Sequence, residues 1–242
     1  MKKILSIGNS FSQDAQRYLQ KVALNEGEKF KCVNLYIGGC SLGQHFVNMT
    51  EDKANYAYEL NGEDTGNMVS IKQALTSDEW DYVTLQQVSQ NAPFFDTYVP
   101  FLEHLAEYVR LYSSKSKILM HQTWAYEIGS ERLREVGFID PHDMLERIKD
   151  SYEKATKLIS ADGIIPSGEM IGGFLGITTK TGALDAGIKR IHRDTFHADL
   201  GIGRYLLALT WFHTFTGRKA SCEYDNFDIE VSKEDVKIIR EL

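Results

Sequence analysis

The chain is poor in cysteine and has no block of basic residues. Its three cysteines are odd in number and show no Cys-x-x-Cys spacing, which argues against a disulfide framework and against a zinc knuckle. The formal net charge of −7 comes without any run rich in Lys and Arg. That balance argues against a nucleic-acid partner and against a polybasic surface that would bind a membrane.

Long hydrophobic runs are also missing. No apolar stretch approaches the roughly 20 residues of a membrane-spanning helix. The apolar run after Lys2 and Lys3 is interrupted at once by Gly8, Asn9 and Ser10, so no signal peptide is predicted. We therefore expect a cytoplasmic protein, with a trimmed leader left open as an alternative. A length of 242 residues with 43% hydrophobic content fits one globular domain spanning residues 1–242.

Short apolar runs alternate with amphipathic segments along the chain. Strands are predicted at residues 4–7, 30–37, 81–85, 117–120 and 163–166. Helices are predicted at residues 13–25, 68–75, 98–112, 144–159, 199–215 and 231–242. Residues 54–60 fit either a short strand or an excursion, and residues 168–184 are Gly-rich and poorly patterned. The alternation predicts a three-layer α/β/α sandwich with a central parallel sheet.

Polar and small residues gather where the predicted strands end. The four segments that follow strand ends are residues 8–12, 38–43, 86–91 and 121–126. Open parallel sheets bind ligands beyond the carboxyl ends of their strands. We therefore expect the functional site to be built from these four loops.

Two short stretches carry residues suited to acyl transfer. Ser10 lies between an apolar strand and a predicted helix, where it can be a nucleophile near free backbone N–H groups or a plain helix cap. Far along the chain, Asp194 stands three residues before His197. Such an Asp can orient one imidazole nitrogen while the other faces a serine, although Asp194 could also cap a helix.

Together these stretches resemble the conserved blocks of the SGNH (GDSL-like) hydrolases. The Gly8-Asn9-Ser10 run resembles the first block, with Asn9 where the commonest form has Asp, and Gly38-Gly39 resembles the second. The Asp194-x-x-His197 pair resembles the last block. Residues 85–90 and 194–201 are similar to a bacterial branch, the DUF4886-type proteins.

The resemblance implies a flavodoxin-like SGNH fold and a serine esterase that needs no cofactor or metal. Ser10 would be the nucleophile, His197 the base and Asp194 the residue that orients it. Likeness to acetylesterase relatives implies a short acyl group, such as acetyl on a carbohydrate or another small molecule. The oligomeric state is left open.

The same resemblance places the oxyanion hole. The backbone N–H groups of Ser10 and Gly39 would contribute, together with a side-chain amide. The family usually supplies that amide from a Gly-x-Asn-Asp quartet, which this chain lacks. We expect Gln86 to replace it because it leaves its strand directly, with Gln90 as the second candidate.

A second serine and a cysteine compete for the role of nucleophile. Ser41 lies in Gly39-Cys40-Ser41-Leu42-Gly43, which matches the G-x-S-x-G nucleophile elbow of α/β-hydrolases. That elbow normally follows a central strand after several others, whereas here it follows only two. Cys40 is a weaker candidate, because nothing nearby suggests a depressed thiol pKa.

Two other classes of function remain as alternatives. A metal-dependent hydrolase could use Asp194, His197 and His192, with His45 or His121 as a further ligand, but His192 and His197 lack the usual i, i+4 spacing. A non-catalytic carbohydrate-binding protein could retain the triad by descent.

Aromatic residues follow two of the strand ends. Trp124 and Tyr126, together with Phe94 and Phe95, could line a sugar or acyl pocket, or they could pack in the core. Trp124 and Tyr126 are the predicted substrate contacts.

Overall fold

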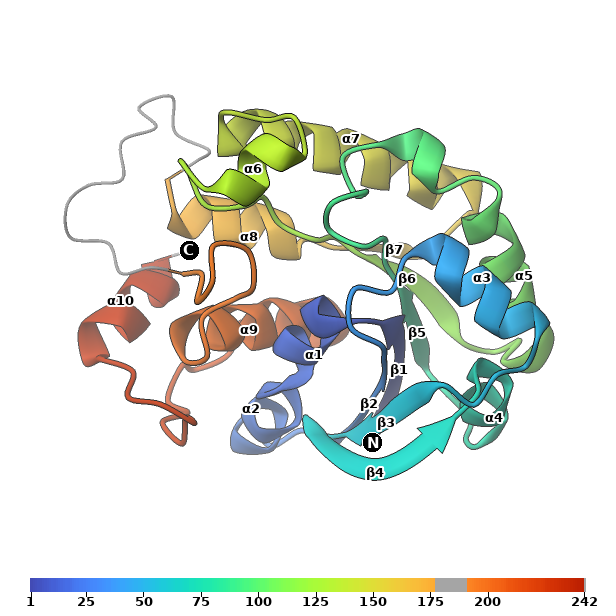
Figure 1. Ribbon diagram of the computed structural model, residues 1–242. Helices are drawn as coiled ribbons and strands as arrows, with labels where there is room; N and C mark the ends of the chain where they lie inside the picture. The colour runs from blue at the N-terminus through green and yellow to red at the C-terminus, as the bar shows by residue number, and fades with distance from the viewer. Residues whose placement is uncertain (177–190, 242) are drawn as a thin grey trace.

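The computed structural model describes residues 1–176 and 191–241, which are organised around one sheet (Figure 1). Its strands, in chain order, are β1 (Lys2–Gly8), β2 (Phe30–Tyr36), β3 (Tyr56–Leu60), β4 (Glu63–Val69), β5 (Tyr82–Leu85), β6 (Lys117–His121) and β7 (Gly163–Ile165). Their order across the sheet is β4-β3-β2-β1-β5-β6-β7. The neighbours from β2 to β7 pair in parallel, as the alternating pattern predicts.

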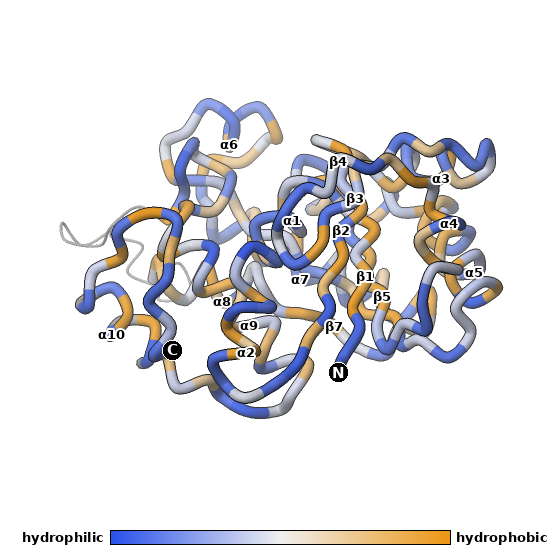
Figure 2. The backbone as a smooth tube through the Cα atoms, turned by 90° about the horizontal axis from the view of Figure 1, so that it is seen from below, coloured by the Kyte–Doolittle hydropathy of each residue, from blue (hydrophilic) through white to orange (hydrophobic). Residues whose placement is uncertain are grey.

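Helices cover both faces of this sheet. They are α1 (Ser10–Gln16), α2 (Leu19–Asn25), α3 (Leu42–Thr50), α4 (Ile71–Thr76), α5 (Phe101–Tyr112), α6 (Glu131–Glu135), α7 (Pro141–Leu158), α8 (Ser167–Phe174), α9 (Ile202–Thr216) and α10 (Lys233–Glu241), with a 3₁₀ turn at Phe95–Thr97. Helices α1, α2 and α9 pack together on one side of the strands, and α3, α4 and α5 pack together on the other (Figures 1 and 2). The predicted three-layer α/β/α fold is confirmed.

The central strand is buried on both faces. Ile4, Leu5 and Ile7 of β1 have no exposed surface, which is typical of a parallel strand covered by helices on each side. Hydrophobic residues likewise run through the inner strands in Figure 2. The one polar side chain in the middle of β1, Ser6, contacts the Thr84 hydroxyl at 2.7 Å and accepts a hydrogen bond from Gln16 Nε2 at 2.7 Å. The last residue of α1 is thereby fixed relative to two adjacent strands, β1 and β5.

The sheet edge differs from the prediction. Residues 54–60 contain β3, which pairs antiparallel with β2, and β4 pairs antiparallel with β3. The hairpin turn is Asn61-Gly62, with φ values of 53° and 83°, as in the tight turns that favour the Asn-Gly pair. β4 was missed because nearly all of its residues are exposed and lack an apolar alternation. The helix predicted at 68–75 consequently begins later, at Ile71, with Ser70 as its cap.

Three helical segments also differ in detail. The predicted helix at 13–25 is two helices, and the first begins at Ser10 because Asn9 caps it. The Gly-rich segment contains α8, and its remainder from residue 177 onward lies outside the described residues. Helix α6 was not predicted. In the described ranges, no helix combines the length and the apolar character needed to cross a membrane.

Candidate active site

Ser10 is presented by a tight turn between β1 and α1. Asn9 accepts a hydrogen bond from Phe11 N at 3.0 Å, and the Ser12 hydroxyl accepts one from Asn9 N at 3.1 Å, which together start the helix. Gly8 is required for close packing, because a Cβ atom there would lie 2.1 Å from Ser12 Oγ. The turn leaves Ser10 partly exposed at the carboxyl end of the strand.

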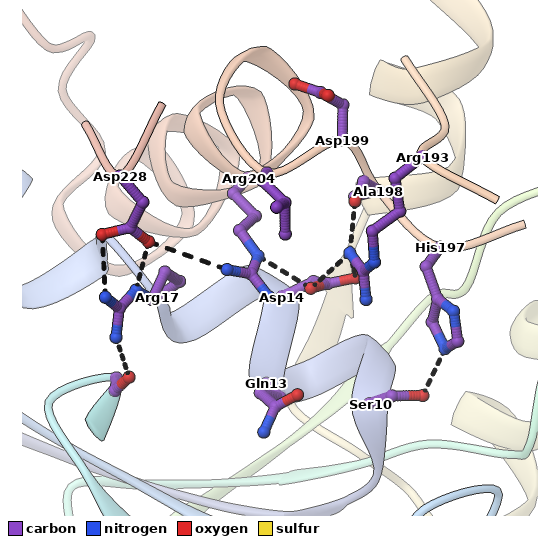
Figure 3. A network of polar contacts seen from close by, with 12 residues as sticks. Ser10, Gln13, Asp14, Arg17, Arg193, His197, Ala198, Asp199, Arg204 and Asp228 are labelled. Atoms are coloured by element: carbon purple, nitrogen blue, oxygen red, sulfur yellow. Dashed lines mark hydrogen bonds and ion pairs between the residues drawn. The ribbon is translucent and has the colours of Figure 1, made fainter. Parts of the chain in front are cut away.

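Ser10, His197 and Asp194 form one hydrogen-bonded chain. The ionised Asp194 carboxylate can only accept hydrogen bonds, so His197 Nδ1 donates to Asp194 Oδ2, at a distance of 2.8 Å. The other ring nitrogen, Nε2, therefore faces Ser10 Oγ as an acceptor, also at 2.8 Å (Figure 3). The structure brings these three side chains together as expected.

The Asp194 carboxylate is held in its charged form. Its Oδ1 also accepts a hydrogen bond from His197 N at 2.9 Å. Partial burial by itself would raise the pKa of Asp194, but the two hydrogen bonds from His197 and the nearby charges lower that pKa below its ordinary value. A charged Asp194 keeps the Nδ1 proton on His197, which leaves Nε2 free to accept a proton from Ser10.

The loop that carries Asp194 and His197 is fastened to the segment after β6. Thr195 adopts a left-handed φ of 74°, which is unusual for a β-branched residue, and its carbonyl accepts a hydrogen bond from Glu127 N at 2.8 Å. The carbonyl of Phe196 accepts one from Trp124 Nε1 at 2.7 Å. These contacts stabilise a backbone conformation that would otherwise be unfavourable.

The two predicted substrate aromatics have different positions. Trp124 is completely buried and stacks on Phe11 with ring centroids 4.1 Å apart, so in this structure it is a core residue rather than a pocket wall. Tyr126 is almost completely buried, and its hydroxyl contacts Ser89 Oγ at 2.8 Å. It nevertheless lines a cavity that opens beside α6.

That cavity, called the α6 cavity below, has a volume of about 570 Å³. Its lining combines amides, charged groups and apolar surface: Gln90, Asn91, Phe94, Tyr126, Arg132, Glu135, Val136 and Gly137. Phe196 connects it to the catalytic histidine candidate. The Phe196 ring centroid lies 3.9 Å from that of His197 and 5.6 Å from that of Tyr126.

Asn9 joins three of the four loops at the strand ends. Its Nδ2 donates to the carbonyl of Cys40 at 3.1 Å, and its Oδ1 accepts from Gln86 Nε2 at 2.7 Å. Because the Gln86 amide is oriented by Asn9, its Oε1 must accept from His121 Nδ1, at 2.9 Å. Sequence reasoning noted Asn9 only as a departure from the commonest family pattern and did not foresee this role.

The predicted oxyanion-hole groups differ in whether their hydrogen-bond donors are already engaged. No described residue accepts a hydrogen bond from the N–H of Ser10 or of Gly39, and Gly39 is exposed with a φ of +65°. Gln86 is 2% exposed and engaged at both ends of its amide, by Asn9 and His121. Gln90 is exposed and lines the α6 cavity.

The competing nucleophiles lie in other environments. Ser41 caps α3 by accepting a hydrogen bond from Gln44 N at 3.2 Å, so the G-x-S-x-G match is a helix start. Burial raises the pKa of the Cys40 thiol to about 12, although a hydrogen bond with Tyr56 opposes the shift. A thiol with so high a pKa is a poor nucleophile at neutral pH.

The other candidate histidines are buried and neutral. Burial lowers the pKa of His45 and of His121 to about 3, and that of His192 to about 4. His192 Nε2 lies 3.1 Å from the carbonyl of Ala125. In the ranges that the structure describes, no group of three or more His, Cys, Asp or Glu side chains is arranged to hold a metal ion.

The chain is similar to one family model and to several solved structures. The model described as domain of unknown function (DUF4886) matches residues 3–239. A DUF4886 family protein from Bacteroides uniformis is 33% identical over 99% of this chain and 92% of its own, with a TM-score of 0.85. No curated protein sequence matches this chain significantly.

More distant structures share the fold. A candidate SGNH hydrolase from Slackia heliotrinireducens is 20% identical, covering 88% of this chain and 98% of its own, with a TM-score of 0.63. An acetyl-xylooligosaccharide esterase from Geobacillus Stearmophilus is 14% identical, covering 89% of this chain and 94% of its own, with a TM-score of 0.53. At these identities the likeness establishes the SGNH-type fold.

Proposed function

This chain belongs to the DUF4886 family, and we propose that it is a serine esterase that hydrolyses short acyl esters. The observation that carries the proposal is the geometry of His197. One of its ring nitrogens lies 2.8 Å from Ser10 Oγ, and the other lies 2.8 Å from the Asp194 carboxylate. A serine paired with an oriented imidazole is the arrangement used in nucleophilic acyl transfer.

The first half of the reaction forms an acyl-enzyme. Ser10 Oγ attacks the ester carbonyl carbon while His197 Nε2 takes the hydroxyl proton. The tetrahedral intermediate then collapses, the bond from carbon to the leaving oxygen breaks, and His197 returns the proton to the departing alcohol. Asp194 stabilises the imidazolium that exists between these two proton transfers.

The second half releases the acid. A water molecule gives a proton to His197 and attacks the acyl carbon. The carbon–Ser10 bond breaks, Ser10 recovers its proton from His197, and a carboxylic acid leaves. The same histidine therefore serves as base and acid in each half.

The oxyanion of both intermediates would be bound by backbone and side-chain donors. The N–H groups of Ser10 and Gly39 supply two of them. Gln90 is our preferred side-chain donor, because it is exposed and lines the α6 cavity, while the amide of Gln86 is engaged by Asn9 and His121. Removing one such donor typically lowers the rate by about 10²–10³-fold.

The α6 cavity supports a carbohydrate as the alcohol part of the ester. Amides from Gln90 and Asn91 can hydrogen-bond to hydroxyl groups, and the Phe94 ring offers a flat apolar surface for a sugar face. A structural neighbour that acts on acetylated xylo-oligosaccharides has the same fold. We therefore propose O-acetyl groups on carbohydrates as the substrate class.

Two turnover assays, together with a measurement of sugar binding, separate the proposal from its alternatives. Turnover of p-nitrophenyl acetate is measured with and without EDTA, and acetate release is then measured from a panel of acetylated sugars. EDTA-resistant turnover that is lost in Ser10→Ala supports the serine esterase. EDTA-sensitive turnover would indicate a metal-dependent hydrolase, and sugar binding without any turnover would indicate a non-catalytic relative.

A further inference from the structure

We propose that Asp14 and Arg193 are positioning residues, whose ion pair holds the loop carrying Asp194 and His197 against the helix carrying Ser10. The kinetic consequences rest on the proposed function. The geometric claim can be tested without it. Figure 3 shows the pair beside the Ser10–His197 contact.

Asp14 is a buried carboxylate on the helix of the candidate nucleophile. It follows Ser10 by four residues in α1, so it lies one helical turn further on. Its side chain has no exposed surface. Burial raises the pKa of Asp14, while the charges and hydrogen bonds of Arg193 and Arg204 act to lower it. A carboxylate in such a place requires these cationic partners.

Arg193 connects this carboxylate to the loop of the triad. Its Nη1 donates to both oxygens of Asp14, each at 2.9 Å. The same nitrogen donates to the carbonyl of Ala198, and Arg193 N donates to the carbonyl of His197 at 3.1 Å. Arg193 therefore holds the loop together from within and attaches it to α1.

The attachment to α1 is specific to Arg193. Trp124 and Glu127 fasten the loop to the segment after β6, not to the helix of Ser10. Apart from the Ser10–His197 contact itself, the polar contacts that join residues 191–199 to α1 within the described part of the chain are those of Arg193. Without them, the distance between Ser10 Oγ and His197 Nε2 would depend on that contact and on ring packing.

Arg204 supplies a matched control. It also binds Asp14, with its Nε 2.8 Å from Oδ1. It lies on α9, and in the described part of the chain its only hydrogen bond to residues 191–199 is from its backbone N to the Asp199 carbonyl, which a side-chain replacement keeps. Replacing either arginine removes one cation from the same buried carboxylate. Only the replacement of Arg193 also releases the loop.

The kinetic experiment compares Arg193→Met with Arg204→Met, using short acyl esters. We expect kcat to fall by about 10- to 100-fold in Arg193→Met with KM changed less than about threefold, since a displacement of about 1 Å can cost about 10²-fold. Arg204→Met should lose thermal stability while its kcat stays within about threefold of wild type. Arg193→Lys, which keeps the cation, should recover part of the lost kcat.

A second readout does not depend on activity. The imidazole nitrogens of His197 are followed by NMR in ¹⁵N-labelled protein and identified by their absence in His197→Ala. Arg193→Met should shift the ¹⁵N resonances of the His197 imidazole, because its hydrogen bonds to Ser10 and Asp194 change. Arg204→Met should leave these resonances at their wild-type positions. An unchanged His197 signal in folded Arg193→Met would overturn the positioning role, whatever the esterase assay shows. A changed signal in a protein that hydrolyses no ester would support the positioning role and contradict the proposed function.

Discussion

Gln86 Nε2 donates a hydrogen bond to Asn9 Oδ1 at 2.7 Å, which joins the loops after β5 and β1 behind the candidate nucleophile. Asn9 also donates from Nδ2 to the carbonyl of Cys40, in the loop after β2. A carboxylate could accept from Gln86, but it could not donate to a carbonyl. This chain therefore requires an amide where the commonest SGNH pattern has an acid.

Replacing Asn9 by Asp should weaken the whole turn. The substitution would leave the Cys40 carbonyl without its donor and place a charge in a site that is 1% exposed. Loss of a buried hydrogen bond of this kind typically destabilises a protein by about 1–3 kcal/mol. We expect a lower free energy of unfolding in urea and a lower kcat.

Ser41→Ala is the control for this variant. It removes a helix cap, which typically contributes about 1 kcal/mol, and the lost hydroxyl is bonded to Gln44 N and not to Ser10, His197 or Asp194. Its stability should fall while its esterase activity stays unchanged. An Asn9→Asp protein as stable and active as wild type would contradict the role assigned to the Asn9 amide.

Gln86 and Gln90 should respond differently to substitution. Gln86→Leu removes an amide bonded to both Asn9 and His121, so both stability and kcat should fall. Gln90→Ala alters an exposed side chain, so stability should stay close to wild type while kcat falls by about 10²–10³-fold. Urea unfolding and steady-state kinetics on the two variants measure these effects. If kcat is unaffected in Gln90→Ala, that residue is not the oxyanion donor.

Much of the fold, and Ser10, Asp194 and His197 as candidate site residues, could be predicted because their signals are local. The turn at Gly8-Asn9-Ser10 follows an apolar run, and Asp194 lies three residues before His197 in a loop ahead of an apolar helix. The β3–β4 hairpin was also signalled locally, by Asn61-Gly62, but the exposed residues of β4 gave no alternation to confirm it.

The positioning contacts could not be predicted, because they join distant parts of the chain. Asp14 and Arg193 are separated by 179 residues, and neither belongs to a recognisable motif. The burial of Trp124 was equally hidden, because an aromatic residue after a strand end can face either the core or the pocket. Tertiary packing decides between these cases.

The members of the triad should act as one unit. His197→Ala should lower kcat as much as Ser10→Ala, and the double variant should be barely slower than either, because each single change already removes the paired nucleophile. Asp194→Asn should lower kcat by a similar or smaller factor, since it leaves the serine and imidazole present. Steady-state kinetics on the four proteins give the comparison.

A serine-directed phosphonate checks the identity of the nucleophile independently. Its mass should appear on the peptide that contains Ser10 and should be absent from Ser10→Ala protein. Label on the peptide that contains Ser41 would refute the assignment, since Ser41 is expected to serve only as the cap of α3.

The buried histidine behind Gln86 should make stability depend on pH. Burial lowers the pKa of His121 to about 3 in the folded protein, against an ordinary value of about 6.5. Between these values the unfolded chain binds a proton that the folded chain does not, so the free energy of unfolding should decrease as the pH falls from 6.5 towards 3. One such group contributes a slope of about 1.4 kcal/mol per pH unit.

His121→Asn should remove that contribution while keeping a side-chain donor for Gln86. We expect the slope of unfolding free energy against pH to become shallower by about 1.4 kcal/mol per unit between pH 6 and pH 4, measured by urea unfolding. His104→Asn, which changes a half-exposed side chain, serves as the control for the loss of a histidine. If the slope is the same in His121→Asn and in wild type, then His121 is not the buried neutral imidazole that this structure describes.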